Sequence, residues 1–345
     1  MPSKTIGFFT RRLWLIILIL VVPIAIVVVL AVSRDDSDAL VIYNGRSHYG
    51  DEQIFRDFED ATGIEVEIRG GTSPELFERL RREGDDTSAD VFVTTDLPSL
   101  WRAQQAGLLQ QVSTPALVDN VSPELADEAG TWWPLSTRLR VPVISTERVD
   151  AGAITSYEDL GNPEYAGRTC LRTSNNEYNQ SLVADMIAKR GYEETEALLR
   201  SWMANDPEIL NSDGELLAVM AGGGCDVGLT NHYYLGRALD ENADFPVAPA
   251  WPDQDGAGAH ANISGVAVVN GTNDEEDAIA LIEFLTSTGA QSVIVDQNSE
   301  FAANPDVPPA EHISEWADVV IDPASNEAGT LFEDAIALMA EVGWR

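Results

Sequence analysis

The fold of this 345-residue chain is decided by the stretch Trp133–Ser145, WPLSTRLRVPVIS. It predicts one long extended segment, of the kind that crosses from one lobe of a protein to another. A second extended segment over 263–269 is placed to bring the chain back. Two crossings between lobes make a hinge, and a hinge makes a cleft that can close on a ligand.

Strands and helices alternate before the first crossing. Ile64, Val66 and Ile68 alternate with glutamates, which is the period of a strand, whereas Ile54 and Phe58 lie on one face of a helix. We therefore expect a parallel sheet covered by helices on both faces. The elements expected here are strands over 39–43, 64–68 and 90–94, a helix over 51–62, a helix with Ser73 as N-cap and Pro74 at its first position that ends at Gly84, and a helix through Leu100 and Trp101.

The alternation resumes after the crossing, so the sequence predicts an α/β protein of two discontinuous lobes. We assign 39–139 with 264–307 to lobe 1 and 140–263 with 308–345 to lobe 2. The elements expected after the crossing are helix 156–160, strand 169–172, helices 177–190, 193–204 and 215–221, strand 225–230, and helices 276–286, 290–296 and 331–342.

An uncharged run, 13–32, is long enough to cross a hydrocarbon core and predicts one transmembrane helix within the N-terminal segment 1–38. Lys4, Arg11 and Arg12 precede it, which places the short N-terminus in the cytoplasm and the rest of the chain outside the cell. The alternative is a signal peptide cleaved near Ala31 and Ser33, but such peptides have a shorter apolar core.

The chain is strongly acidic, with a formal net charge of −36 from 57 acidic and 21 basic residues. Salt screens such self-repulsion, so a halophilic source with an acidic proteome is the economical explanation. No basic stripe is present that would bind nucleic acid. The two cysteines, Cys170 and Cys225, form either a disulfide, if their strands are neighbours, or two buried thiols.

Three tyrosines carry the main functional signal: Tyr178 in NEYNQ, and the adjacent pair Tyr233 and Tyr234 in NHYY. Clustered phenolic oxygens are an uncommon way to hold a hard trivalent cation, for which iron(III) is the obvious candidate. The pair precedes a helix at the carboxyl end of a predicted strand, where open α/β sheets bind ligands. The alternative is half-buried packing with the hydroxyls at the surface.

Six segments resemble the periplasmic ferric-iron-binding proteins of ABC importers, especially their cyanobacterial branch. The resemblance implies a type II periplasmic-binding-protein fold, iron(III) held in the cleft by tyrosines, and delivery to a permease driven by an ATPase. The segments, in order, are IYNGRSHY at 42–49, ADVFVTTD at 89–96, TRLRV at 137–141, SNNEYNQS at 174–181, NHYYLGR at 231–237 and NISGV at 262–266.

The resemblance also implies roles for single residues. Tyr233 and Tyr234 match the pair that binds iron throughout the family, and Tyr178 matches the tyrosine of the cyanobacterial branch. His48 and Tyr49 match a histidine and tyrosine of the first loop after a shift of one residue; without the shift, Ser47 and His48 align instead.

Two positions depart from the family pattern. Ile144 replaces a tyrosine, and Thr95, beside Asp96, replaces the acidic ligand of the pathogen branch.

An anion site is expected beside the tyrosines. Ser174, Asn175 and Asn176 open the helix that carries Tyr178, and such a helix start accepts an anion, so carbonate or phosphate can complete the coordination of the iron. Arg138 and Arg140 can add positive charge there; the alternative is that they form ion pairs with surface carboxylates.

Motifs of the common enzyme classes are missing, including G-x-S-x-G, H-E-x-x-H and the P-loop, so we expect no enzyme. We expect a monomer tethered to the cell membrane that works with an ABC permease and its ATPase. The alternatives are the same fold with another solute, such as an oxyanion, another metal or thiamine, and a receptor that senses iron without transporting it.

Overall fold

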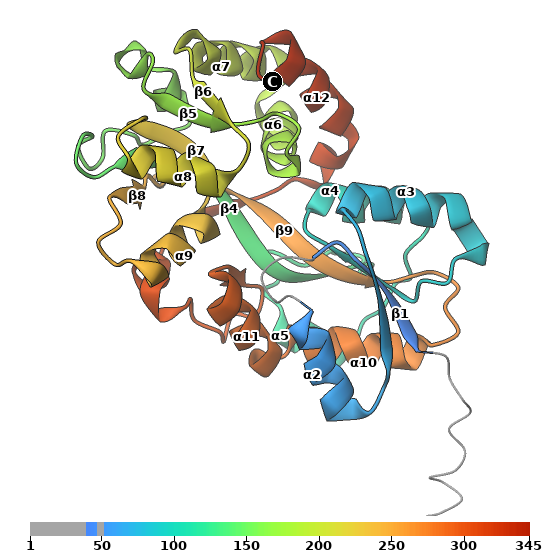
Figure 1. Cartoon of the computed structure of the whole chain (residues 1–345). Helices are drawn as coiled ribbons and strands as arrows, with labels where there is room; N and C mark the ends of the chain where they lie inside the picture. Colours follow the sequence, from blue (N-terminus) through green and yellow to red (C-terminus); the bar gives the residue numbers. More distant parts are fainter. Residues whose placement is uncertain (1–38, 47–51) are drawn as a thin grey trace, which may run out of the picture. The chain divides into compact units, whose positions relative to one another are not determined.

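The computed structural model describes residues 39–46 and 52–345. Leu40–Arg345 form one compact unit (Figure 1). The predicted transmembrane run, 13–32, and the first-loop residues His48 and Tyr49 lie outside the described residues. Within the described part, no single helix meets the length and hydropathy expected of a membrane span; α10 (Glu275–Thr286) and α11 (Thr288–Asn298) do so only as a pair bent by 59°.

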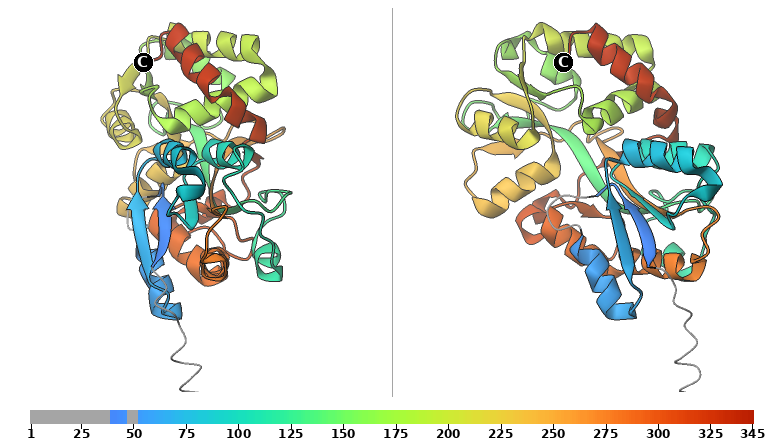
Figure 2. Two further views of the ribbon diagram at one scale, coloured as in Figure 1. Left: turned by 90° about the vertical axis from the view of Figure 1, so that its right-hand side faces the viewer. Right: turned by 45° about the vertical axis from the view of Figure 1, so that its right-hand side comes forward.

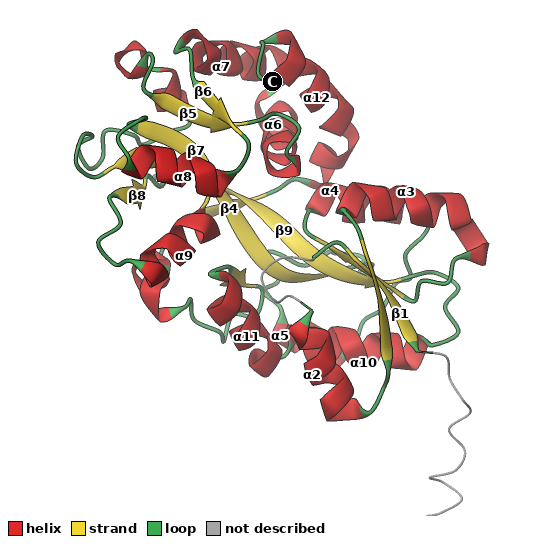
Figure 3. Ribbon diagram, viewed as in Figure 1, coloured by secondary structure: helices red, strands yellow, loops and turns green. Residues whose placement is uncertain are grey.

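One mixed sheet runs through this unit in the order β2-β1-β3-β9-β4-β7-β5-β6 (Figure 3). Three parallel strands lie at each end, as the strand–helix alternation predicts. They are β1 (Leu40–Asn44), β2 (Val66–Gly70) and β3 (Val91–Thr94) at one end, and β5 (Thr169–Arg172), β6 (Glu208–Leu210) and β7 (Val227–Asn231) at the other. The parallel pairing expected from this alternation is confirmed, whereas the two central strands run antiparallel to the strands beside them and make the sheet mixed.

The central strands are β4 (Trp133–Ser145) and β9 (Ala259–Val268), which run side by side between the two halves (Figure 1). From Trp133 to Leu139, β4 pairs with β9. From Arg140 to Ile144, it pairs instead with β7. One continuous strand therefore belongs to both halves of the sheet, as predicted for Trp133–Ser145.

Helices cover both faces of the sheet in the first half (Figure 2). Leu40 and Ile42 of β1 pack in one core with α2 (Gln53–Thr62) and α10. Val41 and Tyr43, which point to the other face, pack in a second core with α3 (Ser73–Glu83) and α4 (Leu97–Gln105).

The second half is built in the same way. Leu171 and Leu229 pack with α6 (Glu177–Arg190), α7 (Tyr192–Ala204) and α12 (Phe332–Glu341), whereas Cys170 packs with α8 (Asp213–Ala221) and α9 (His232–Glu241). The remaining named elements are short: α5 (Pro115–Asn120), β8 (Val247–Pro249), β10 (Phe301–Ala302) and β11 (Ile321–Pro323).

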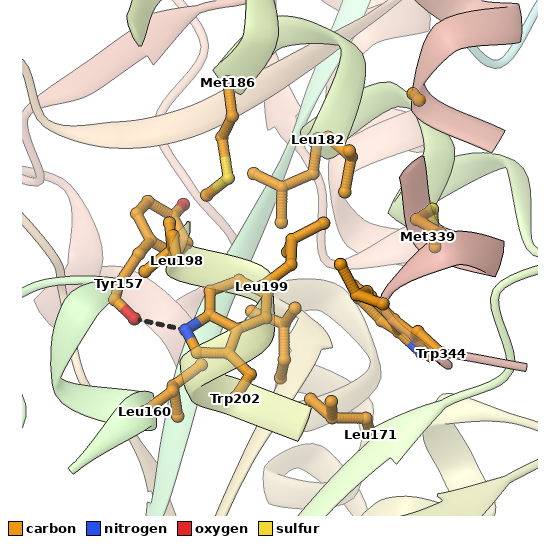
Figure 4. Close-up of a cluster of buried hydrophobic side chains, with 14 of the residues drawn as sticks. Tyr157, Leu160, Leu171, Leu182, Met186, Leu198, Leu199, Trp202, Met339 and Trp344 are labelled. Carbon is orange, nitrogen blue, oxygen red and sulfur yellow. Dashed lines mark hydrogen bonds between the residues drawn. The ribbon is translucent and has the colours of Figure 1, made fainter. Parts of the chain in front are cut away.

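Two tryptophans anchor the core between α6, α7 and α12 (Figure 4). The rings of Trp202 and Trp344 meet edge to face with centroids 5.9 Å apart. Trp202 Nε1 donates to the Tyr157 carbonyl at 2.9 Å, and Trp344 Nε1 donates to the Arg172 carbonyl at 2.8 Å. Trp344 therefore fixes the end of β5, from which the chain continues to Tyr178.

Two local predictions are wrong. The N-cap of α3 is Thr72 rather than Ser73, because Thr72 and Glu75 form a reciprocal capping box. Ser73 instead accepts a hydrogen bond from Thr95 N at 2.9 Å. The helix expected over 156–160 is a single 3₁₀ turn, Glu158–Gly161, because Asp159 accepts hydrogen bonds from the backbone N–H groups at 155 and 156 and thereby holds a turn.

Cys170 and Cys225 form a disulfide. Cys170 lies in β5 and Cys225 lies just before β7, and these strands are parallel neighbours, so the Cα atoms are 5.8 Å apart. The bond closes a loop with a sequence separation of 55 residues that includes all of α6 and α7. It therefore restrains the segment that carries Tyr178.

Candidate metal centre

The three candidate tyrosines lie where two neighbouring strands end. Tyr233 and Tyr234 are in the first turn of α9, directly after β7, and Tyr178 is in the first turn of α6, shortly after β5. Because β5 and β7 are parallel and adjacent, their carboxyl ends meet at the same edge of the sheet. The structure therefore brings together residues that are 55 positions apart in the sequence.

The three rings form one cluster. Tyr178 and Tyr233 meet edge to face with centroids 6.4 Å apart, and Tyr233 and Tyr234 lie 4.5 Å apart at 31°. Tyr178 and Tyr233 are buried, whereas Tyr234 is half-buried. The hydroxyl of Tyr233 accepts a hydrogen bond from Asn231 Nδ2 at 3.4 Å.

Burial raises the pKa of both Tyr178 and Tyr233, although the positive charge of Arg138 acts against the shift. Both side chains are therefore neutral phenols at neutral pH in the absence of a metal ion. A bound trivalent cation reverses this preference, because it favours the phenolate over the phenol. The guanidinium groups of Arg138 and Arg237 lie 5.7 and 5.1 Å from the centre of the Tyr233 ring and add positive charge beside it.

Arg138 is oriented by a buried acid that sequence reasoning did not identify. Its Nε donates to Glu300 Oε1 at 2.9 Å, and Arg46 Nη1 donates to Glu300 Oε2 at 3.2 Å. Burial alone would raise the pKa of Glu300, but Arg138 and Arg46 outweigh it and lower the pKa to about 2. The network thus links the arginine beside Tyr233 to Arg46, the last described residue before the loop of His48 and Tyr49.

Arg140 is fully buried and makes its hydrogen bonds to protein groups. Its Nη1 donates to Asp213 Oδ1 at 2.6 Å and to Asn231 Oδ1 at 3.2 Å, and its Nε donates to Asn179 Oδ1 at 3.0 Å. Asn179 follows Tyr178, and Asn231 lies two residues before Tyr233. Arg140 therefore ties together the two segments that carry the tyrosines.

The predicted anion site at the start of α6 is partly occupied by the chain's own side chains. Asn176 Oδ1 accepts a hydrogen bond from Tyr178 N at 3.1 Å, so Asn176 is the N-cap of the helix. Asn175 Oδ1 accepts from Thr173 Oγ1 at 2.6 Å, and the Ser174 carbonyl accepts from Gln180 Nε2 at 3.1 Å. These contacts hold the helix start in place beside the tyrosines.

His232 and Ile144 are both buried in the core, and the ring of His232 meets the Tyr233 ring edge to face with centroids 6.0 Å apart. His232 Nδ1 accepts a hydrogen bond from Leu139 N at 3.0 Å, and the ring stacks on Phe301 at 4.8 Å. Burial lowers the pKa of His232 to about 4, so the ring is neutral. Ile144, at the position of the family's tyrosine, is paired with Val227 and packs among apolar residues.

A second acid missed by sequence reasoning is Glu177, the first residue of α6. Its Oε1 accepts a hydrogen bond at 3.1 Å from Thr95 Oγ1, which belongs to the other half of the sheet. Burial and the charge of Asp96 raise the pKa of Glu177 to about 7, although Arg138 and Arg172 act against this. From the sequence, Glu177 is an ordinary acidic residue in a first helical turn; its position directly before Tyr178 was the only signal.

Residues 86–320 match the family model for bacterial extracellular solute-binding proteins. The chain belongs to this family. Solute-binding proteins of transporters bind and release a solute and are not enzymes. The members of this family are extracellular proteins.

Relatives of this solute-binding protein include iron uptake protein A1 of Synechocystis sp., which is 33% identical over 314 residues and covers 88% of this chain and 87% of the relative. The structure resembles FutA (IdiA) of Trichodesmium in complex with iron and citrate, with a TM-score of 0.81 and 33% identity over 89% of this chain and all of that one. It also resembles the apo ferric ion-binding protein A of Pasteurella haemolytica, with a TM-score of 0.81 and 30% identity over 89% of this chain and 98% of that one. The predicted family and the two-lobed α/β fold are confirmed.

Proposed function

We propose that this chain is the solute-binding protein of an ABC importer, that iron(III) is its cargo, and that Tyr178, Tyr233 and Tyr234 bind the ion through their phenolate oxygens. The observation that carries the proposal is the convergence of these three rings where β5 and β7 end. Iron-binding relatives that match nearly nine-tenths of the chain support it.

The chemistry follows from the surroundings of the tyrosines. Iron(III) favours anionic oxygen ligands, and three phenolates would neutralise its charge. Because Tyr178 and Tyr233 are buried, they stay protonated until the ion arrives, so these two side chains add no negative charge to the empty site. Metal binding then releases protons and favours the closed arrangement of the lobes, which the permease and its ATPase recognise.

The proposed site also includes further ligands, an anion and a movement of the two lobes. We propose His48 and Tyr49 as further ligands, and carbonate or phosphate as the occupant of a remaining position near Arg138 and the start of α6. Relative motion of lobe 1 (39–139 and 264–307) and lobe 2 (140–263 and 308–345) would open and close the site. The change of partner in β4 after Leu139 supports this boundary.

The test is a titration of the purified full chain with iron(III) citrate in high salt, followed by visible absorption. A broad tyrosinate-to-iron band that saturates near one iron per chain is the expected result. A folded protein without such a band would refute iron(III) as the cargo and direct the search to an oxyanion, another metal or thiamine.

We further propose that the run 13–32 anchors the chain in the cell membrane with the binding unit outside. Resistance of the full chain to alkaline carbonate extraction from membranes is the expected result, and release into the soluble fraction would exclude the anchor. A transmembrane anchor of this kind would keep the binding unit near its permease.

The net charge of −36 supports a halophilic origin and predicts that salt stabilises the protein. Raising KCl from about 0.1 to 2 M shortens the screening length from about 10 Å to below about 3 Å, so repulsion between surface carboxylates falls. We expect the melting temperature, followed by circular dichroism, to rise steadily over this range. A flat or falling melting temperature would show that the acidic surface does not limit stability.

A further inference from the structure

We propose that Glu177 is a fourth protein ligand of the iron(III) cargo, through its carboxylate oxygen Oε2. This inference rests on the proposed function, because it assigns a further residue to the tyrosine site. It concerns a side chain that lies beside the tyrosines and contacts the opposite half of the sheet.

Glu177 is placed by the same helix start as Tyr178. Both residues lie in the first turn of α6, and Asn176 caps this turn through its contact with Tyr178 N. The side chain of Glu177 reaches the end of β3, where Thr95 Oγ1 lies 3.1 Å from Oε1. Its carboxylate is therefore held against the first half of the sheet, and its charge acts on the neighbouring Tyr178.

One oxygen of the carboxylate is held by a chain of hydroxyls. Thr95 N donates to Ser73 Oγ at 2.9 Å, and the hydroxyls of Ser73 and Thr95 lie 3.0 Å apart. With Ser73 donating to Thr95 and Thr95 donating to Glu177, each hydroxyl hydrogen is used once. Ser73 is free for this contact because Thr72, rather than Ser73, caps α3.

The other oxygen is available. Over 39–46 and 52–345, Oε2 of Glu177 makes no hydrogen bond, and the side chain forms no ion pair within 4.0 Å. Arg138 and Arg172 are near enough to favour its negative charge without binding it directly. A carboxylate with one fixed oxygen and one open oxygen has the geometry of a monodentate ligand.

An ordinary structural role does not account for these features. An acid in a first helical turn usually stabilises the helix dipole from the surface, at no cost in desolvation. Glu177 is instead half-buried at the junction of the two halves of the sheet, where a carboxylate without an ion pair is less well solvated than at the surface. The neighbouring acid Asp96 shows the contrast: its two oxygens accept hydrogen bonds from Ser99 N at 2.8 Å and Ser99 Oγ at 3.1 Å and so cap α4.

The contact with Thr95 gives Glu177 a second property. Thr95 and Glu177 belong to opposite halves of the sheet, so their hydrogen bond requires the halves to be close together. A ligand that is oriented by the other half binds the ion best in the closed arrangement. Glu177 thereby contributes a contact that differs between the open and closed states, which is what a ligand needs to shift the equilibrium.

The test compares iron(III) complexes of four full-chain variants with wild type. Glu177→Gln keeps the shape and removes the charge, Glu177→Asp keeps the charge on a shorter stem, and Thr95→Val removes the hydroxyl that holds Oε1. The matched control is Glu193→Gln, an exposed acid in the first turn of α7. Each is titrated with iron(III) citrate, and both the affinity and the wavelength of the visible band are recorded.

We expect Glu177→Gln to keep a tyrosinate-to-iron band, because the three tyrosines remain. Loss of an anionic donor leaves the ion more electron-poor, so the band should move to longer wavelength. Affinity should fall by at least about 10- to 100-fold, the loss that even outer-shell partners of a metal cause. Thr95→Val should change the affinity and the band wavelength in the same direction, but by less. Glu177→Asp should bind iron(III) more tightly than Glu177→Gln. Glu193→Gln should match wild type in both quantities.

A Glu177→Gln complex with the wild-type wavelength would overturn the proposal, whether or not its affinity changed, because a merely structural residue does not alter the band. If Glu177→Gln does not fold by circular dichroism, the same two readouts on Glu177→Asp and Thr95→Val decide the question. Absence of the band in wild type refutes iron(III) as the cargo itself. The two failures are therefore distinguishable.

Discussion

Replacing Tyr233 and Tyr234 together by phenylalanine should abolish the visible tyrosinate-to-iron band and weaken iron(III) binding by at least about 100-fold, because two direct ligands are lost where one outer-shell partner already costs 10- to 100-fold. The packing should survive, since the rings remain at 4.5 Å from each other and only two hydroxyls are removed. Visible absorption and competition with citrate measure the effect.

The control for this variant is Tyr192→Phe, a change of the same kind at an exposed tyrosine in α7. It should leave the band and the affinity unchanged. If the double variant kept a saturable band of wild-type intensity, Tyr178 and residues outside the described part would have to supply the phenolates, and the pair would not be the iron site. Equal circular dichroism spectra for the three proteins establish that each is folded.

Arg140→Ala is expected to lower the free energy of unfolding by about 3–5 kcal/mol, because breaking a buried ion pair leaves an uncompensated charge. The Arg140 and Asp213 side chains are 1% and 0% exposed, so solvent cannot replace the lost partner. Arg172 Nη1, which also bonds Asp213 at 2.7 Å, should keep the loss toward the lower end of that range. Urea unfolding in high salt measures it.

The matched change at the surface is Arg200→Ala. Arg200 is half exposed and pairs with Glu196 and Glu341, so its loss should cost about 1 kcal/mol or less. Arg140→Ala should also weaken iron binding, because Asn179 and Asn231 would lose the group that holds them together. A loss of stability no larger than that of Arg200→Ala would show that Arg140 is dispensable to the core.

Long, strongly patterned elements were predicted closely from the sequence. The bounds of β4 and α6 agree with the structure, because an unbroken extended run and a capped apolar helix each carry a local signal. The three-residue strands β6, β8 and β11 were missed, since three residues carry no periodicity. The mixed sheet was also missed, because strand direction depends on how distant segments pair.

The same contrast between local signals and contacts of distant segments applies to the site. Tyr178, Tyr233 and Tyr234 could be selected from the sequence, and the structure brings them together through the adjacency of β5 and β7. Glu300 and Glu177 could not be selected from the sequence, because the role of an acidic residue depends on the side chains that surround it in the folded protein. Arg140 was predicted to face an anion, but its hydrogen bonds are to groups within the protein, and the anion site itself stays a prediction.

The pairing of β4 with β9, and then with β7, has a mechanical consequence. A flexible linker between two halves would permit rotation in any direction, whereas two hydrogen-bonded strands form a ribbon that bends readily only perpendicular to its own plane. We therefore expect motion of one half against the other to follow one soft direction, with its amplitude shared over many backbone dihedrals, and we expect Thr95 to approach Glu177 along the same path in each closure.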